Sequence, residues 1–590
     1  MQKHYDRRQK VGKLRQLRYS EHSFSYSYQS AMDRRRFIKL SSLLGGSLTL
    51  STQLTGCASA PKTKEYFPAV EFTHGVASGD PTTSAVILWT RAVPADTDDS
   101  GYVRWQIATS PDFNSPLRDG VAKTTRNNDF TVKIDVQDLP AGRSFYYRFF
   151  TSENASVTGT TSTLATGIID KLKFAVFSCA NYPAGYFNAY RAAAEDSEVD
   201  VVLHLGDYIY EYPKGGYATA NAEAIDRDFM PGNEGELLTL KDYRLRYATY
   251  RQDNGLQLLH QRKPFIAIWD DHEIANDTYM SGAQNHSADE GDFFARRTAA
   301  IQAYYEWLPI RPPMGDDNPQ IYRSFEFGNL VNLYMLDTRV IGREKQLNMA
   351  DYKQTDGQFD GKAFMQALHN PDRTLLGSAQ FNWLADEVKQ SSARWQVLGQ
   401  QILMGKMHYP AEVLTSEREA VAGAIESLLS LLKKQEAGAT LSKEEQARLA
   451  TKLPYNLDAW DGYAAERDKV LSMFSDAQKS LLVIAGDTHN GWVNKLTNNR
   501  GETVAMEYAT PSVSSPGMED YLGLNTAQAK RLADALPLLI DDLSYCNLHE
   551  RGYMTMTFTL SMVTTQWHYV SNISNENYTV FTRHTERFVN

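Results

Sequence analysis

The sequence predicts an α/β protein of the α+β kind, in which an N-terminal β-sandwich precedes a layered α/β domain. Residues 70–166 alternate short apolar runs with turn residues, which is typical of an immunoglobulin- or fibronectin-like sandwich. From residue 171 to about residue 575, buried strand patterns alternate with helical patterns, which indicates a sheet covered by helices. Residues 576–590 are predicted to form a C-terminal tail.

Alternating apolar residues predict four strands in the sandwich. They are Ser84–Thr90, Tyr102–Ala108, Asp129–Val136 and Ser144–Phe150. Asp-Pro, Asn-Asn and Pro-Ala-Gly sequences punctuate these runs and mark turns. Because no group of chemically reactive residues lies among them, we expect this part of the chain to pack against or orient the rest.

The second part contains five buried strand patterns, at Lys173–Cys179, Val201–Leu205, Phe265–Trp269, Trp395–Leu403 and Leu481–Ala485. Helices are expected at Gln380–Lys389 and Ala527–Leu543, together with an inserted helical hairpin at about residues 416–452. Two alternating runs near the C-terminus, Tyr553–Leu560 and Thr564–Val570, are expected to add antiparallel strands to the edge of the sheet.

Length, charge and cysteine count narrow the function. The 590 residues exceed what one hydrophobic core usually supports, so at least two domains are expected. The formal net charge of −10 argues against a role in binding nucleic acid through its phosphates. The three cysteines, Cys57, Cys179 and Cys546, do not make a disulfide framework. We expect a monomer in which Cys546 is a small core residue.

The N-terminal region resembles a bacterial export signal. Arg34-Arg35, with Phe37 and Lys39, stands before the apolar stretch 40–56, as in twin-arginine signals. That stretch is shorter than the ~20 residues of a membrane-spanning helix, which is the alternative interpretation. Leu54-Thr55-Gly56-Cys57 resembles a lipobox, in which the cysteine becomes the acylated N-terminus, and a chance cysteine is the alternative.

These features assign residues 1–57 to an export signal and lipobox region and residues 58–69 to a tether. Met32 is then the expected start, and residues 1–31 are not translated. We expect a bacterial lipoprotein that the twin-arginine machinery exports to the periplasm or cell surface. Lipid on Cys57 would tether it to the membrane.

Metal-binding residue types follow four of the buried strands: Cys179 ends one, Asp207 follows the next, and Asp270-Asp271-His272-Glu273 and Asp487-Thr488-His489 follow two more. Ligands bind at the carboxyl ends of strands in open α/β sheets, so we expect these residues at one edge of one sheet. A thiolate from Cys179 and a phenolate from Tyr210 favour a transition metal, and the residue types allow Zn, Mn or Fe, with Mg as a further option. Oxygen ligands around them suit Ca²⁺.

Several blocks in the same order carry a family resemblance. They are Gly75-Val-Ala-Ser-Gly-Asp-Pro81, Val86-Ile-Leu-Trp-Thr-Arg91, the Gly206–Tyr212 and Trp269–Glu273 segments, Leu336-Asp-Thr-Arg339, Leu457-Asp-Ala-Trp-Asp-Gly-Tyr463, Gly486–His489 and Ala509-Thr-Pro511. This set resembles the calcineurin-like metallophosphoesterases, and within them the PhoD-like alkaline phosphatases. The resemblance covers nearly the whole chain after residue 70 and implies a four-layered α/β/β/α domain after the sandwich.

The resemblance also implies a set of site residues. The expected metal ligands are Cys179, Asp207, Tyr210, Asp271, Asp487 and His489, holding Fe³⁺ and Ca²⁺, with Asp207 bridging the metals. His272 is expected to contact the phosphate and assist departure of the alcohol. Arg244 and Arg246 are candidates for holding the phosphate.

Some residues keep a second interpretation. Cys179 could be a plain buried thiol, Asp270 could be a ligand or a supporting residue, and Glu273 is expected to support ligands. His204 is expected to be a core histidine.

The predicted function is hydrolysis of phosphate monoesters, diesters or both, with a small phosphate ester as substrate and a metal-bound hydroxide or oxide as nucleophile. One alternative is a phospholipase D-like phosphodiesterase acting on lipid or cell-envelope polymers. A metal-stabilised surface binding protein is the non-enzymatic alternative. Pocket depth, and a possible lid from residues 520–545, would set the preference between monoesters and diesters.

Overall fold

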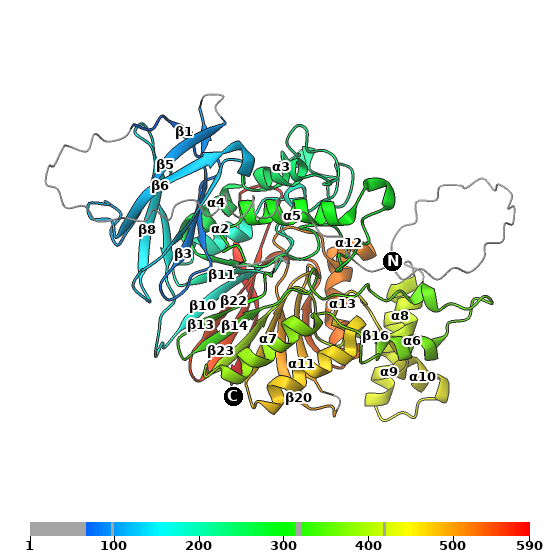
Figure 1. Cartoon of the computed structure of the whole chain (residues 1–590). Coiled ribbons are helices and arrows are strands. Elements are labelled where there is room, and N and C mark those ends of the chain that lie inside the picture. The colour runs from blue at the N-terminus through cyan, green and yellow to red at the C-terminus, as the bar shows by residue number, and fades with distance from the viewer. Residues whose placement is uncertain (1–65, 96–98, 314–319, 417–419, 499, 590) are drawn as a thin grey trace, which may run out of the picture. The chain divides into compact units, whose positions relative to one another are not determined.

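The computed structural model describes residues 66–95, 99–313, 320–416, 420–498 and 500–589, which belong to one compact unit (Figure 1). The predicted export signal, Cys57 and residues 58–65 of the predicted tether lie outside the described residues. At the end of that tether Phe67 is already buried, and its backbone bonds to Ser152. Among the described helices, none is both long enough and apolar enough to cross a membrane.

The N-terminal part is the expected sandwich of two β-layers. One layer is a four-stranded sheet in the order β6-β5-β8-β9: β5 (Ser100–Ala108), β6 (Arg118–Thr125), β8 (Ser144–Phe150) and β9 (Gly159–Ser162). The facing layer comprises β2 (Val76–Gly79), β3 (Val86–Arg91) and β7 (Thr131–Val136). Buried side chains of both layers, such as Leu88, Val132, Ile107 and Phe149, form a shared core. Strand β6 escapes sequence prediction because most of its side chains are exposed or half-buried and polar.

The sandwich is joined to the second part through a common sheet. Strands β2, β3 and β7 belong to a nine-stranded sheet in the order β24-β23-β22-β10-β11-β12-β2-β3-β7. Its other members are β10 (Leu172–Phe177), β11 (Val201–His204), β12 (Phe265–Ala267), β22 (Arg551–Phe558), β23 (Met562–Val570) and β24 (Val580–Val589). Strands β10, β11 and β12 are parallel, and β12 pairs with β2 at Phe265 and Gly79. One layer of the predicted 70–166 domain therefore continues the sheet of the predicted 171–575 domain.

A seven-stranded sheet forms the second central layer, in the order β13-β14-β15-β18-β20-β19-β21. Its strands are β13 (Arg323–Phe327), β14 (Val331–Met335), β15 (Trp395–Gly399), β18 (Leu481–Ala485), β19 (Gly491–Thr497), β20 (Thr503–Ala509) and β21 (Leu543–Asn547). The small sheets are β1 (Val70–Glu71) with β4 (Val93–Pro94), and β16 (His408–Pro410) with β17 (Lys452–Pro454).

Alternation along β18 shows how the two large sheets pack. Leu482 and Ile484 join the core shared with the nine-stranded sheet, whereas Leu481 and Val483 join a core with α7 (Gly377–Gln390) and α11 (Ala464–Asp476). Successive residues of a strand point to opposite faces, so both faces of this strand are buried. The resulting order is helices, nine-stranded sheet, seven-stranded sheet and helices, which confirms the predicted α/β/β/α layers.

Described α-helices cover the outer faces of both large sheets, and further helices lie beside the seven-stranded sheet (Figure 1). Those whose buried residues pack on the nine-stranded sheet are α2 (Asn188–Glu195), α3 (Leu240–Tyr250), α4 (Asn254–Arg262) and α5 (Phe293–Trp307). The others are α6 (Gly361–Leu368), α7 (Gly377–Gln390), α8 (Ala411–Thr415), α9 (Val421–Glu436), α10 (Lys443–Ala450), α11 (Ala464–Asp476), α12 (Met518–Leu522) and α13 (Thr526–Leu539).

Two C-terminal predictions need correction. The predicted tail 576–590 contains β24, which pairs along its length with β23 and completes the edge of the nine-stranded sheet. Its side chains are mostly exposed or half-buried, so the apolar alternation that marks a strand is weak. The helix predicted to reach Leu543 ends at Leu539, and Leu543 begins β21. Helix α13 packs into the core beside α9 and β21, so most of the segment proposed as a lid is a structural layer.

The inserted helical hairpin occurs as α9 and α10, within the predicted residues 416–452. Val421, Ile425 and Leu428 of α9 are buried against the core that contains α13.

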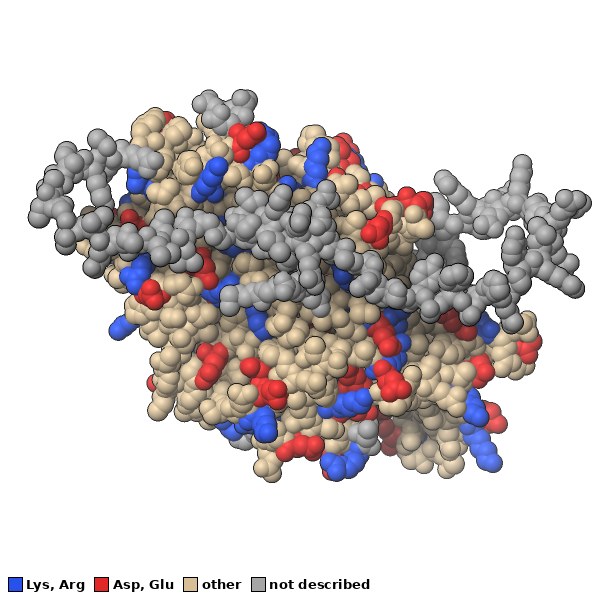
Figure 2. Space-filling model, in the orientation of Figure 1, with Lys and Arg blue, Asp and Glu red and all other residues tan. Residues whose placement is uncertain are grey.

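On the face drawn in Figure 2, acidic and basic side chains are interspersed over a surface made mostly of other residues.

Candidate metal centre

The candidate ligands lie where strands of both large sheets end. Cys179 follows β10 and Asp207 follows β11 in the nine-stranded sheet, whereas Asp487 and His489 follow β18 in the seven-stranded sheet. The expectation of a single sheet edge is therefore wrong. The two sheets pack face to face, and their strand ends converge on one site.

The backbone at these strand ends is held in an unfavourable conformation. The φ angles are 60° at Cys179, 53° at Asp207, 61° at Asp487 and 63° at His489, in the left-handed region that side chains rarely adopt. Such residues persist only where the surrounding structure fixes them, and they cluster at functional sites. Gly206, with φ of 103°, permits the turn before Asp207, because a Cβ there would lie 2.3 Å from the Cβ of Asp270.

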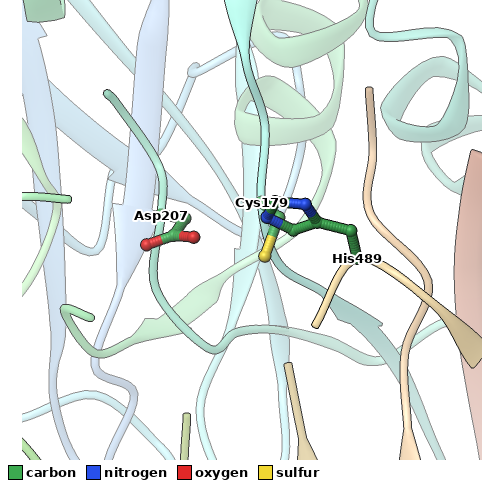
Figure 3. A group of neighbouring side chains, drawn as sticks. All are labelled: Cys179, Asp207 and His489. Atoms are coloured by element: carbon green, nitrogen blue, oxygen red, sulfur yellow. The ribbon is translucent and has the colours of Figure 1, made fainter. Parts of the chain in front are cut away.

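Three groups of ligand atoms meet at the centre. Each group has its ligand atoms within 4.8 Å of one another: Cys179, Asp207 and His489; Asp207, Asp271 and His272; and Asp270, Asp271 and Asp487. Figure 3 shows the first group, whose side chains come from three separate chain segments. Because Asp207 and Asp271 each belong to two groups, the three groups form one continuous cluster suited to more than one cation.

His489 is oriented as a metal ligand would be. Its Nδ1 lies 2.6 Å from the carbonyl oxygen of Pro516, so Nδ1 carries the proton and donates it there. The Nε2 lone pair then faces the cluster, 3.1 Å from the hydroxyl of Tyr210. A hydrogen bond from the far ring nitrogen commonly fixes the tautomer of a metal-bound histidine. Burial lowers the pKa of His489 to about 3, which keeps the ring neutral and able to bind a metal.

Tyr210 joins the same group. Its hydroxyl donates to Oδ2 of Asp207 over 3.0 Å, and the hydroxyl of Ser515 donates to Tyr210 over 2.8 Å. The Tyr210 ring lies 4.3 Å from that of His272, centroid to centroid. The structure therefore brings Tyr210 to the ligands Asp207 and His489, as the sequence predicts.

The buried acids of the cluster fit bound cations. Oδ1 of Asp207, Oδ2 of Asp270 and Oδ1 of Asp271 are buried without a hydrogen-bond partner among the described residues. Burial raises the pKa of Asp207 and of Asp487 well above their usual range and that of Asp270 to about 7. Burial, and then the charge of Asp207, also raises the pKa of the Cys179 thiol. Cations placed among these groups would hold them ionised and satisfy their lone pairs.

One arginine supplies positive charge that the sequence analysis did not assign. The guanidinium of Arg339 is fully buried and bonds to Asp270, lies 2.7 Å from Asp458 and is 3.3 Å from Asp487. Arg339 and Arg343 offset the burial of Asp458 and lower its pKa to about 2. Arg339 and Asp458 lie in the quoted family blocks Leu336–Arg339 and Leu457–Tyr463, and their presence there was the available signal.

Glu273 supports the site through the backbone. Its carboxylate accepts hydrogen bonds from the amides of Asp207 at 3.0 Å, Asp270 at 2.7 Å and Tyr208 at 2.5 Å. These bonds fix the two turns that carry Asp207 and Asp270. Glu273 therefore has the supporting role that was expected of it.

His272 is paired with a second buried acid, Glu211. The two side chains are 2.7 Å apart at Nδ1 and Oε2, and the other oxygen of Glu211 accepts from the Asn276 amide and the Asn285 side chain, each over 2.8 Å. Although burial opposes it, Glu211 raises the pKa of His272 well above its usual range. The pairing with Glu211 therefore favours the protonated form of His272, which lies beside Asp207 and Asp271.

Comparison with known proteins shows which family the chain belongs to. Residues 174–567 match the model described as PhoD-like phosphatase, and residues 56–165 match that of the PhoD-like phosphatase N-terminal domain. The chain belongs to the PhoD-like phosphatase family. Alkaline phosphatase D of Bacillus subtilis (strain 168) is 32% identical over 551 residues, which cover 90% of this chain and 84% of that protein. A solved structure described as "Structure of PhoD" matches with a TM-score of 0.70 and 28% identity, covering 90% of this chain and 92% of its own.

Two arginines of this PhoD-like chain that were predicted to bind phosphate make structural contacts instead. Arg246 is fully buried in α3 and donates to the backbone carbonyls of Tyr210 and Tyr212. Arg244 forms an ion pair with Glu306 at 2.6 Å. Both guanidinium groups are thereby committed to structural contacts, so their assignment as substrate-binding residues is wrong. Residues two positions apart in a helix project in different directions, and sequence alone did not show that both sides of α3 are covered.

Two further expectations are confirmed by burial. His204 is buried and its Nε2 lies 2.7 Å from the Tyr190 hydroxyl, as expected of a core histidine. Cys546 is a buried free cysteine in the core beside α13.

Proposed function

We propose that this protein is an exported, metal-dependent alkaline phosphatase that hydrolyses phosphate esters. The observation that carries the proposal is the continuous cluster of Cys179, Asp207, Asp271, Asp487 and His489. One carboxylate oxygen of Asp207 and one of Asp271 are buried there without a hydrogen-bond partner among the described residues. The name of the B. subtilis relative supports the reaction class. We propose that Fe³⁺ lies at the thiolate end of the cluster and Ca²⁺ at the all-oxygen end, because a thiolate favours a transition metal and oxygen ligands suit calcium.

The residues divide the work of hydrolysis as follows. Bound cations would supply positive charge to the phosphoryl oxygens and activate water for in-line attack. The water oxygen forms a new bond to phosphorus while the bond from phosphorus to the ester oxygen breaks, and the remaining proton of the water leaves with the phosphate product. His272 donates its proton to the departing oxygen, so an alcohol leaves rather than an alkoxide. Glu211 holds the imidazole of His272 in place and favours its protonated form.

Protein purified without added metals tests the proposal. We expect iron near one equivalent per chain by elemental analysis, calcium-dependent turnover, and hydrolysis of p-nitrophenyl phosphate, its bis-ester or both. The ratio of the two ester rates separates monoesterase from diesterase activity. Properly folded protein that binds no metal and turns over neither ester would overturn the proposal.

The export part of the proposal depends on the Arg34-Arg35 pair and the Leu54–Cys57 lipobox in the sequence. Membrane attachment of the mature chain through lipid on Cys57 follows from the same motif. In cell fractionation, Cys57→Ala is expected to move the protein from the membrane fraction to the aqueous fraction. An unchanged distribution would contradict the lipid anchor and leave the hydrolase assignment unaffected.

Replacement of His272 by Gln tests the proton donor. We expect kcat/KM for glycerol 2-phosphate to fall about 10²-fold or more, because a poor leaving group needs the proton. The loss for p-nitrophenyl phosphate should be much smaller, since p-nitrophenolate leaves without protonation. His286→Gln is the control, because His286 contacts the Gly291 carbonyl and lies outside the three ligand groups. Equal losses for both esters would assign His272 to phosphate or metal binding instead.

A further inference from the structure

A cluster of three aromatic rings lies between the metal centre and the surface. The rings of Tyr217 and Tyr521 lie 6.2 Å apart with an interplanar angle of 5°. His489 lies 6.2 Å from the ring of Tyr217 and 6.4 Å from that of Tyr521, at angles of 29° and 24°. The candidate metal ligand His489 is therefore nearly equidistant from the two tyrosines, and both rings lie directly beside it.

One ring of the cluster, that of Tyr521, is accessible to solvent. Tyr521 is 53% exposed, whereas Tyr217 is half-buried and His489 is buried. Large aromatic side chains exposed beside an active site are candidates for binding the apolar part of a ligand. The accessible ring of Tyr521 is also close to the metal centre, since its centroid lies 6.4 Å from that of the candidate ligand His489.

Several contacts fix this ring before any ligand binds. The Tyr521 hydroxyl donates to that of Tyr217 over 3.1 Å, and Tyr217 in turn donates to the Pro516 carbonyl over 3.2 Å. Helix α12, which carries Tyr521, is attached at Met518, whose amide donates to Asn490 over 3.1 Å. A preformed surface loses little conformational entropy when a ligand stacks on it.

We propose that Tyr521, supported by Tyr217, forms a subsite that stacks on a planar aromatic group of the phosphate ester, such as an aryl ring or a nucleobase. This proposal depends on the phosphoesterase function and extends it to a substrate class. Offset aromatic stacking favours ring centroids 4.5–7 Å apart, the spacing already present between these rings. The ring of Tyr521 lies 6.4 Å from that of the candidate ligand His489. A substrate whose base or aryl ring is separated from its phosphate by a short linker can span a distance of this size. Stacking tolerates any base, so the subsite selects for aromaticity rather than for one nucleotide.

Two matched pairs of ligands test the subsite in the metal-loaded enzyme. Adenosine 5′-monophosphate and ribose 5-phosphate both release the primary 5-hydroxyl group of a ribose, and only the nucleotide carries a base. Tyr521→Ala is expected to lower kcat/KM about fivefold for the nucleotide and to leave that for ribose 5-phosphate unchanged. In calorimetric titration the same variant should bind phenylphosphonate about fivefold more weakly and should bind methylphosphonate with unchanged affinity. Tyr521→Phe keeps the ring and should behave as the unmodified protein.

Tyr102→Ala is the control for loss of an exposed tyrosine elsewhere, because Tyr102 is 46% exposed on β5 of the sandwich. It should change neither pair. Equal effects of Tyr521→Ala on both members of a pair, or no effect on either, would overturn the subsite, as would failure of phenylphosphonate to bind. A wild-type enzyme that hydrolyses no ester while still preferring phenylphosphonate over methylphosphonate would instead refute the phosphoesterase function and retain the subsite.

Discussion

Replacement of Asp207 by Asn is expected to lower phosphate-ester hydrolysis about 10³-fold or more and to remove bound metal. Asp207 is the residue shared by the thiolate-containing group and the group containing His272, so its loss disrupts both. Cations at such sites supply several kcal/mol of transition-state stabilisation, and each ~1.4 kcal/mol is tenfold in rate. Steady-state kinetics and elemental analysis of the same preparation measure both effects.

Stability of the metal-free protein should respond in the opposite direction. The Asp207 carboxyl is buried with one oxygen unpartnered, and an amide removes the cost of burying its charge. We therefore expect the melting temperature of metal-free Asp207→Asn to equal or exceed that of the unmodified metal-free protein. Asp253→Asn is the control: Asp253 is buried and pairs with Arg227 at 2.8 Å, outside the ligand groups, so metal content should persist. Full metal content in Asp207→Asn would contradict the ligand assignment.

Replacement of Arg339 by Met is expected to destabilise the fold by about 3–5 kcal/mol, because it leaves buried carboxylates without their counter-charge. The guanidinium is fully buried and contacts Asp270, Asp458 and Asp487, and its loss leaves the fully buried Asp270 without its ion-pair partner. Denaturant unfolding of metal-free protein at neutral pH measures the change without a contribution from metal release. Loss of Arg339 should also lower metal affinity in the loaded protein, because the carboxylates lose their fixed positions.

Arg244→Met supplies the comparison for Arg339. Arg244 pairs with Glu306 in a partly exposed position, where an ion pair contributes about 1 kcal/mol or less. If the Arg339→Met midpoint shifts no further than that of Arg244→Met, the buried network is not a major source of stability. Arg339→Lys retains the charge and loses the fork of donors, so it should fall between the two.

Sequence reasoning identified most of the candidate site because its residues lie at the ends of recognisable strands. Apolar runs at residues 173–179, 201–205 and 481–485 predicted buried strands, and each runs into a Cys, Asp or His. The structure brings Cys179, Asp207 and His489 within 4.8 Å of one another. The local pattern was sufficient here because a strand end positions its next residues regardless of which strand is its neighbour.

The same reasoning failed where position depends on packing between distant elements. Arg244 and Arg246 have the residue type that binds phosphate, but covered faces of α3 commit them to Glu306 and to backbone carbonyls. The nearly featureless segment Val580–Val589 becomes a strand because β23 offers a free edge to pair with. In both cases the deciding neighbour is a residue or strand that no local pattern reveals.

The sequence by itself determined the family and the candidate ligand residues, because ordered blocks and strand ends are local features, and the order of layers followed from the family resemblance. Only the tertiary structure showed that the ligands come from two facing sheets and that the sandwich shares a sheet with the phosphatase domain. It also placed Arg339 among acids that are 69, 119 and 148 residues away in the chain. Contacts at such separations arise when independently formed layers pack together, so their partners are set by the whole fold.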